Sequence, residues 1–242
     1  MPLILAGLIM LFGSFVQGAL GFALGMIAVP LLVDAGYSLS QAVALTTLAI
    51  GIQVMAGAWQ LRDYIPWSDV KLAAIVRYAT VPIGIMLLLL VEDINGSDVK
   101  PLVGIGVLIG VAIRFAAARQ LRRDPPLPLS VAAFAVSGIL QGLVAMGGPP
   151  LVLWMTTREF RAHQARAFTM TLFLLNTPIQ VLLLLFLSRT MSLEVVASAL
   201  LLSPLIFLGT TIGVRAGNHF SKPLLNRLAL AVLVVIGFNA IF

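Results

Sequence analysis

The sequence predicts an all-α integral membrane protein built from two inverted repeats, each a re-entrant helical hairpin followed by three transmembrane helices. Three observations predict this fold: the composition, the lengths of the apolar runs and the placement of the basic residues. Hydrophobic residues make up 60% of the 242 residues and charged residues only 10%, whereas charged residues make up about a quarter of a soluble domain. Nearly the whole chain is therefore expected to lie in a membrane.

The apolar runs fall into two classes of length. A helix needs about 20 apolar residues to cross a membrane, and six runs of about that length are predicted as spans: 39–61, 67–91, 99–118, 162–187, 193–214 and 223–242. Two other runs, 2–33 and 127–157, would each reach roughly 46 Å as a straight helix, more than a hydrocarbon core of about 30 Å. Both contain helix-breaking residues near their centres, in QGALGFALG (17–25) and QGLVAMGGPP (141–150). Each long run is therefore predicted to be a hairpin that enters and leaves on one side.

The basic residues favour this arrangement over eight simple crossings. If every run crosses once, the 15 basic residues divide almost evenly between the two sides. If the two long runs are re-entrant, all of them except Lys100 and Arg189 fall on one side. Cytoplasmic loops carry an excess of Lys and Arg, so we expect that side to be cytoplasmic and both termini to be non-cytoplasmic. The net charge of +6 then reflects membrane topology, and no nucleic-acid partner is predicted.

Four short sequence matches recur in the same order in the two halves of the chain. These are QG at 17–18 and 141–142, QAVALT at 41–46 and QARAFT at 164–169, IG at 83–84 and 212–213, and KPL at 100–102 and 222–224. They predict a first repeat over 1–118, a basic linker over 119–126 and a second repeat over 127–242. An odd number of crossings gives the two repeats opposite orientations, as in inverted-repeat transporters.

The glycine-rich elements carry a resemblance to a known family. Each half contains a glycine-rich element followed by a second element with small and polar residues: GALGFALGMIAVPLL (18–32) before QAVALTTL, and GLVAMGGPPLVLW (142–154) before QARAFTMT. In these elements the chain resembles the sulfite exporter TauE/SafE family, and the resemblance covers essentially its whole length. The resemblance implies transport of sulfite, organosulfonates or other small organic anions without ATP hydrolysis. We therefore expect a multi-pass protein of the cell membrane, in bacteria the inner membrane, that binds a small anion and lipid. A homodimer is left open.

The glycines of the two breaks are candidates for binding this anion. The N-terminus of a half-helix offers unpaired N–H groups and a positive dipole, and glycine lets a ligand approach the backbone closely. Proline lacks an N–H and suits the first helical turn. These arguments give the candidates Gly18, Gly21, Gly25, Gly142, Gly147, Gly148 and Pro149. The alternative is that the small residues serve close helix packing.

Four further polar residues and one arginine complete the candidate site. Gln17 and Gln141 precede the breaks and could donate to an anion, or could cap their own hairpins. Thr46 and Thr169 match each other in the repeat, although membrane threonines often bond back to the preceding turn. Arg77 lies about ten residues into its span, hence roughly 15 Å from its start, where a charge indicates function; snorkelling to the interface is the alternative.

The residues that are missing narrow the classes of function. The chain has no cysteine, and it offers no paired histidines and no pair of carboxylates on one helical face. No catalytic residue, metal or cofactor is therefore predicted, and the protein is not expected to be an enzyme. The favoured function is a secondary transporter that works by alternating access, with the substrate near the midplane between the two hairpin tips. The alternatives are a passive anion channel or, less favoured, a membrane-embedded enzyme.

Overall fold

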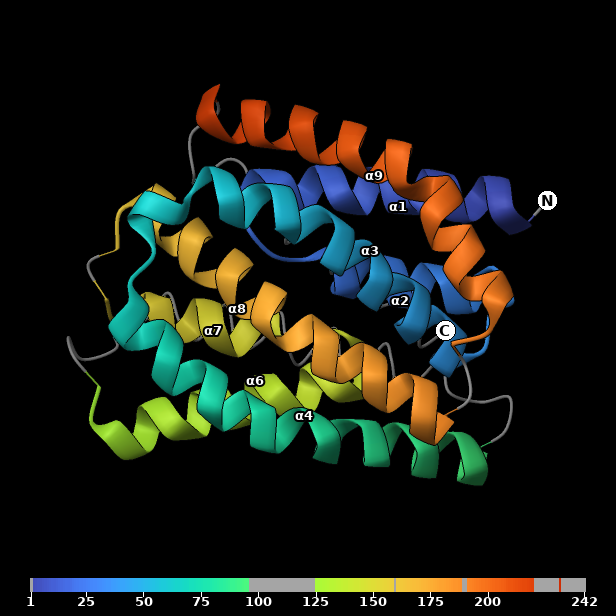
Figure 1. Ribbon diagram of the computed structural model, residues 1–242, viewed down its shortest axis with the longest axis horizontal. Coiled ribbons are helices and arrows are strands. Elements are labelled where there is room, and N and C mark those ends of the chain that lie inside the picture. Colours follow the sequence, from blue (N-terminus) through green and yellow to red (C-terminus); the bar gives the residue numbers. More distant parts are fainter. Residues whose placement is uncertain (1, 96–124, 159, 189–190, 220–230, 232–242) are drawn as a thin grey trace.

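The computed structural model describes residues 2–95, 125–158, 160–188, 191–219 and 231, and the elements in these residues are all helical (Figure 1). The first half contains α1 (Pro2–Leu20), α2 (Leu24–Asp34), α3 (Leu39–Gln60), the short 3-10 helix η1 (Arg62–Tyr64) and α4 (Trp67–Asn95). The second half contains α6 (Leu127–Val144), α7 (Gly148–Met155), α8 (Ala162–Leu183), its π-helical continuation η2 (Leu184–Ser188) and α9 (Leu193–His219). Six of the described helices, α1, α3, α4, α6, α8 and α9, are long and apolar enough to cross a membrane.

Four of the predicted spans match helices of the structure. The predictions 39–61, 67–91, 162–187 and 193–214 correspond to α3, α4, α8 with η2, and α9. The predicted spans 99–118 and 223–242, and most of the linker 119–126, lie outside the described residues. The all-helical, multi-span membrane architecture is thus confirmed for the part of the chain that the structure describes.

Both long apolar runs are broken where the glycines predict a break. Residues 21–23 separate α1 from α2, residues 145–147 separate α6 from α7, and the chain turns back at each break (Figure 1). Left-handed backbone makes these turns, with φ of 88° at Gly21, 106° at Ala23 and 53° at Ala145. Pro149 and Pro150 follow in the first turn of α7, where a missing N–H costs no helical hydrogen bond.

The arms of the two hairpins are unequal, whereas the sequence suggested two half-helices in each. The first arms, α1 and α6, have 19 and 18 residues, and the second arms, α2 and α7, have 11 and 8. The first arms reach full spanning length because the backbone leaves the helix only at the left-handed residues, and Gly18 and Gly142 upstream of them remain helical. The path of each hairpin relative to the membrane remains a prediction.

Each first arm packs against the last described helix of the opposite half. In Figure 1, α1 lies along α9 and α6 lies along α4. A Cβ added to Gly18 would lie 2.6 Å from the carbonyl oxygen of Thr210, and one added to Gly142 would overlap the carbonyl oxygen of Val81. Glycine is therefore needed at both positions for the backbones to approach this closely.

A second pair of glycine contacts follows the same pattern. A Cβ on Gly84 of α4 would overlap the carbonyl oxygen of Ile139 in α6, and one on Gly213 of α9 would overlap the carbonyl oxygen of Phe15 in α1. Ile139 corresponds to Phe15 and Gly213 to Gly84 at the spacing of the sequence repeat. The contacts between α1 and α9 thus repeat those between α6 and α4.

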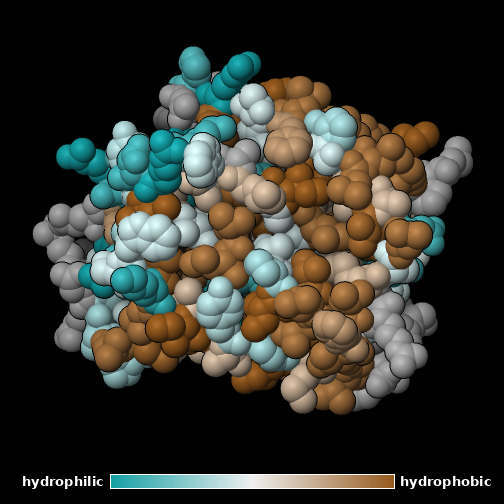
Figure 2. All heavy atoms as spheres, in the orientation of Figure 1, coloured by the Kyte–Doolittle hydropathy of each residue, from teal (hydrophilic) through white to brown (hydrophobic). Residues whose placement is uncertain are grey.

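Charged side chains gather at one end of the helical bundle. Figure 2 shows hydrophilic residues toward the left of the view, where Figure 1 places the α3–α4 and α7–α8 connections. Arg62, Lys71 and Arg161 are exposed there, and Arg158 forms an ion pair with Asp69 at 3.1 Å. These are residues that the charge argument assigns to the cytoplasmic side.

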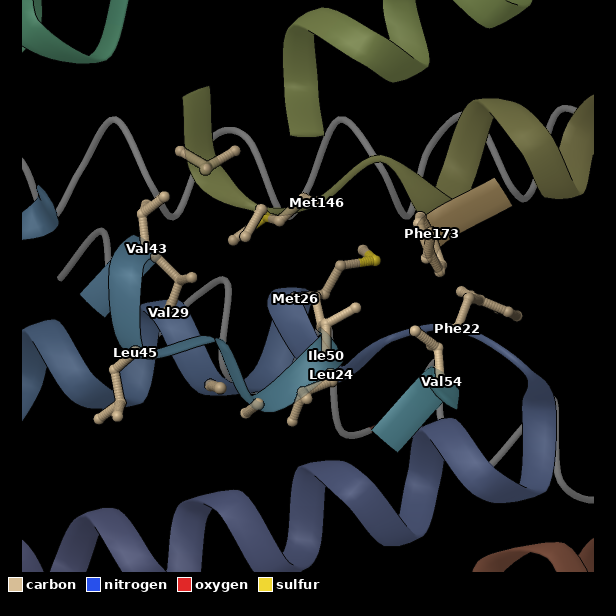
Figure 3. Packing of buried hydrophobic residues seen from close by; sticks show 14 of the residues in the cluster. Phe22, Leu24, Met26, Val29, Val43, Leu45, Ile50, Val54, Met146 and Phe173 are labelled. Carbon is tan, nitrogen blue, oxygen red and sulfur yellow. The ribbon is translucent and has the colours of Figure 1, made fainter. Parts of the chain in front are cut away.

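The apolar core surrounds the two breaks. Figure 3 shows Met26 of the first hairpin next to Met146 of the second and Phe22 next to Phe173 of α8, with Leu24 in the same buried cluster. Leu24 is fully buried, and the other four side chains are at least 96% buried. The breaks are thus held inside protein, which is what irregular backbone at membrane depth requires.

Candidate functional site

The two breaks touch each other. A Cβ added to Gly25 would overlap the carbonyl oxygen of Ala145, so the first turn of α2 lies directly against the second break. A Cβ added to Gly148 would lie 3.1 Å from the Cβ of Phe22, so the start of α7 also lies against the first break, although less tightly. Two segments that are far apart in the sequence therefore form one contact region.

Gln17 and Gln141 play matching roles at the breaks. The backbone N–H of Leu24 donates to Gln17 Oε1 at 3.0 Å, and that of Gly147 donates to Gln141 Oε1 at 3.2 Å. Each glutamine thereby satisfies an amide near the start of its own second arm, where no helical partner exists. The capping alternative is therefore observed for both residues, and it leaves their amide N–H₂ groups for other contacts.

The two amide groups differ in those contacts. Gln141 Nε2 donates to Gln180 Oε1 at 3.0 Å, and Gln180 Nε2 donates back to the carbonyl oxygen of Gln141 at 2.9 Å. Gln17 Nε2 is buried and has no hydrogen-bond partner among the described residues. The second break is thus tied to α8, and the first keeps a free donor.

Arg77 is fully buried beside the second break. Its Nε donates to Asn176 Oδ1 at 3.2 Å, and its Nη1 donates to Ser137 Oγ. Ser137 Oγ in turn donates to the carbonyl oxygen of Gly147 at 2.6 Å. The guanidinium carbon lies 5.4 Å from the centroid of the Phe173 ring, within cation–π range. Arg77 therefore does not snorkel to an interface in this structure.

One donor of this buried cation is unsatisfied. Arg77 Nη2 has no hydrogen-bond partner, and no carboxylate forms an ion pair with Arg77 in the described part of the chain. A Cβ on Gly147 would lie 2.9 Å from Nη1 and 2.8 Å from Gln141 Oε1, so the glycine leaves room for this network. A positive charge with a spare N–H is thus held next to a helical break by neutral groups alone.

The remaining candidates lie outside the network around Arg77. Gly21 lies against the start of α8, since a Cβ there would be 3.2 Å from both Arg166 Cγ and Thr169 Oγ1. Thr169 Oγ1 bonds back to the carbonyl oxygens of Ala165 and Arg166, at 3.1 Å each. The Thr46 hydroxyl is buried and has no partner among the described residues. Gly18 and Gly142 lie in helix–helix contacts, and Pro149 is buried in α7.

The structure therefore brings together Arg77, Gln141 and Gly147, and it joins Gly25 and Gly148 at the contact between the breaks. Three polar residues that were not among the candidates complete the network: Ser137, Asn176 and Gln180. Ser137 lies one helical turn before Gln141, and Asn176 one turn before Gln180. Polar pairs at this spacing in an apolar span share one helical face, and that pattern could have identified them.

A cavity of about 360 Å³ lies at a different place, between the start of α3 and the start of α9. It contains none of the candidate residues. Burial and the nearby carboxylate of Glu194 raise the pKa of Tyr37 in its wall. The cavity is lined by Leu3, Tyr37, Gln41, Leu45, Glu194, Val195, Ala197, Ser198 and Leu201. Among the described residues, no three His, Cys, Asp or Glu side chains are grouped so as to hold a metal ion.

Comparison with known proteins gives two matches and one negative result. The family described as "Sulfite exporter TauE/SafE" matches residues 5–240. A curated protein of Cupriavidus necator, named "Probable sulfite/organosulfonate exporter TauE", is 25% identical over 232 residues, which cover 93% of this chain and 88% of that protein. No solved structure matches the chain significantly.

Proposed function

This chain belongs to the sulfite exporter TauE/SafE family, and from that premise we propose that it is a secondary transporter that moves sulfite, an organosulfonate or a related small anion across the membrane by alternating access. Membership of an exporter family identifies a membrane transporter with a small anionic substrate and a lipid environment, and no enzymatic activity is part of the proposal. The anion would bind between the two hairpin tips, near the middle of the membrane.

The observation that carries the proposal is the buried guanidinium of Arg77. Burying an unpaired charge is costly, and the neighbours of Arg77 are neutral. Guanidinium forms strong, directed hydrogen bonds to the oxygens of anions, more so where water is excluded. A sulfite or sulfonate oxygen on the free Nη2 would supply both the missing hydrogen bond and the missing countercharge.

Two features support a mechanism in which one half moves against the other. The contacts of α1 with α9 repeat those of α6 with α4, as expected if the halves are inverted repeats that each contribute helices to the opposite half. The breaks meet between the halves, which is where inverted-repeat transporters bind substrate. Motion of one half relative to the other would then expose the tips alternately to the two sides.

The topology belongs to the same proposal. The charged end with the α3–α4 and α7–α8 connections would face the cytoplasm, under the positive-inside rule. The α2–α3 connection and both termini would lie on the other side, and in bacteria the membrane would be the inner one.

Transport by purified protein in liposomes tests the proposal. We expect saturable uptake of radiolabelled sulfite or methanesulfonate, with acceleration by unlabelled anion on the opposite side. Arg77→Gln should reduce uptake by at least about tenfold, corresponding to the loss of a charge-assisted hydrogen bond of about 1.5–3 kcal/mol. Arg62→Gln, which removes an exposed arginine in the α3–α4 connection, is the matched control and should transport normally.

The same assay separates the alternatives. Flux that rises without saturation would favour a passive channel built from the same hairpins. Full activity of a correctly inserted Arg77→Gln variant would show that Arg77 is not the anion ligand.

A further inference from the structure

The buried polar residues around the first break correspond in the repeat to those around the second, but the two sets are unequal. Ile206 of α9 lies one turn before Thr210 and two turns before Gly213, as Arg77 of α4 lies before Val81 and Gly84. Those flanking residues make the repeated contacts with α1 and α6 described above. Ile206 therefore takes the place of Arg77 in the opposite half, and both side chains are fully buried.

Asn176, the hydrogen-bond partner of Arg77, corresponds in the repeat to Gln53, whose side-chain oxygen receives no hydrogen bond from any described residue. Gln53 follows Thr46 by two turns in α3, as Asn176 follows Thr169 in α8. Asn176 Oδ1 accepts a hydrogen bond from Arg77 Nε, whereas Gln53 Oε1 is buried and has no partner among the described residues. This difference follows because isoleucine has no donor to offer.

The glutamines at the breaks show the same asymmetry. Gln141 Nε2 donates to Gln180, which lies one turn beyond Asn176. The residue one turn beyond Gln53 is Gly57, which has no side chain, and Gln17 Nε2 is accordingly unpartnered. The surroundings of the first break thus offer a free donor and a free acceptor that are both uncharged, and the surroundings of the second break offer the cation, Arg77.

The buried region consequently contains one positive charge. Arg77 is the fully buried ionisable side chain of the described residues, and the polar groups that contact it belong to Ser137 and Asn176. Arg166 lies beside Gly21 at the first break but is only half-buried, so solvent compensates part of its charge, whereas the charge of Arg77 is fully enclosed. An anion with one charge would neutralise Arg77, whereas a dianion would leave one negative charge uncompensated in a region of low dielectric.

We infer that the site is selective for monoanions, such as sulfonates and hydrogen sulfite, over dianions of the same size. The uncharged Gln17 Nε2 and Gln53 Oε1 are suited to hydrogen-bonding a neutral part of such a ligand and add no charge to the site. This inference rests on the proposed function, because it concerns the same anion site.

Two matched pairs of ligands test the inference on the unaltered, detergent-solubilised protein. Methanesulfonate and sulfate are both tetrahedral at sulfur. Sulfate has a charged oxygen where methanesulfonate has a methyl group, so sulfate is the dianion of the pair. Isethionate and sulfoacetate share the sulfonate and differ in whether the far end is a hydroxyl or a carboxylate. Titration calorimetry should give a dissociation constant at least about tenfold lower for the monoanion of each pair, a difference of about 1.4 kcal/mol.

The outcomes distinguish this inference from the proposed function. Equal or tighter binding of sulfate and sulfoacetate would overturn monoanion selectivity and leave anion transport intact. If none of the four ligands bound, and sulfite did not bind either, the proposed function itself would be overturned.

A variant extends the test to the surroundings of the first break, where Ile206 takes the place of Arg77. Ile206→Arg would add a second buried charge and should reduce the preference for methanesulfonate over sulfate by about tenfold or more. Ile206→Met, which keeps an apolar side chain of similar size, is the control and should retain the preference. A folded Ile206→Arg protein with an unchanged preference would contradict the inference, and if that variant does not fold, the ligand pairs on the unaltered protein decide alone.

Discussion

Arg77 shows how one residue can set the chemistry of an otherwise apolar molecule. Its guanidinium is held by an asparagine, a serine and an aromatic ring, none of which neutralises it. A cation in such surroundings is stabilised by hydrogen bonds and by the face of the ring, but it keeps its attraction for an anion. These surroundings support the proposal that Arg77 serves anion binding rather than stability.

Gly25 gives a stability prediction at the residue scale. Gly25→Ala should destabilise the protein by about 1–3 kcal/mol, the usual cost of overpacking, because the new Cβ would overlap the carbonyl oxygen of Ala145, and backbone cannot rotate away. Thermal unfolding in detergent, followed by circular dichroism, measures the effect as a lowered Tm.

Gly7→Ala is the matched control for this prediction. Its Cβ would meet only the side-chain tips of Leu205 and Leu202, at 3.1 and 3.3 Å, and these can shift. If the two variants unfolded at the same temperature, the tight contact between the breaks would be contradicted.

The candidate residues show what sequence alone can predict of the site. Arg77, Gln141 and Gly147 were found because charges, glutamines and glycines are conspicuous in an apolar run. Ser137 and Gln180 were missed because their spacing of four residues from Gln141 and Asn176 was not used. That spacing places each pair on one helical face, but only the fold places Ser137 beside Arg77 and Gln180 beside Gln141. The inclusion of Gly18 and Gly142 shows the opposite limit, because a glycine that packs helices looks the same as one that faces a ligand.

The hairpins are the elements that position the site. The breaks in the two long apolar runs could be predicted, since run length and Gly–Pro content depend only on local sequence, and the re-entrant path itself stays a prediction. The unequal arms of the hairpins could not be predicted, because the turn depends on left-handed backbone at Ala23 and Ala145, and alanine gives no sign of that conformation. Tertiary contacts such as that of Gly25 with Ala145 hold these residues in place.

The two capping glutamines give a prediction at this scale. Gln141→Leu removes the acceptor for the N–H of Gly147 and both contacts with Gln180, whereas Gln17→Leu removes only the acceptor for the N–H of Leu24. We expect each variant to be destabilised by about 1–3 kcal/mol per buried group left unsatisfied, and therefore a larger fall in Tm for Gln141→Leu. A larger fall for Gln17→Leu would mean that the tie to α8 does not stabilise the second break.

At the scale of the whole molecule, the exchange of helices between the halves is the main feature. α1 packs with α9 and α6 packs with α4, so the first arm of each hairpin packs against the half to which it does not belong in sequence, whereas the second arms, α2 and α7, contact α3 and α8 of their own halves. The repeat of short motifs predicts two related units, but it contains no information on which helices are neighbours. That information lies in the glycines at which facing helices approach most closely. These glycines cannot be recognised as contact positions before the pairing of the helices is known.

Membrane topology is the prediction that belongs to the whole molecule. The chain contains no cysteine, so a single introduced cysteine reports one position. In intact cells, a membrane-impermeant maleimide should label Ala35→Cys in the α2–α3 connection and should label Asp63→Cys in η1 only after the membrane is permeabilised. Labelling of Asp63→Cys in intact cells with protection of Ala35→Cys would reverse the assigned orientation.

The contact between Gly25 and the carbonyl of Ala145 also limits how the protein can change over evolution. Because main-chain atoms form this contact, the identity of the residue at position 145 matters little for it, whereas position 25 tolerates no side chain at all. If the breaks bind the anion, as proposed, substitutions at their other positions would change which anion is selected and would leave this main-chain contact in place. Position 25 would then remain glycine in relatives that carry different anions.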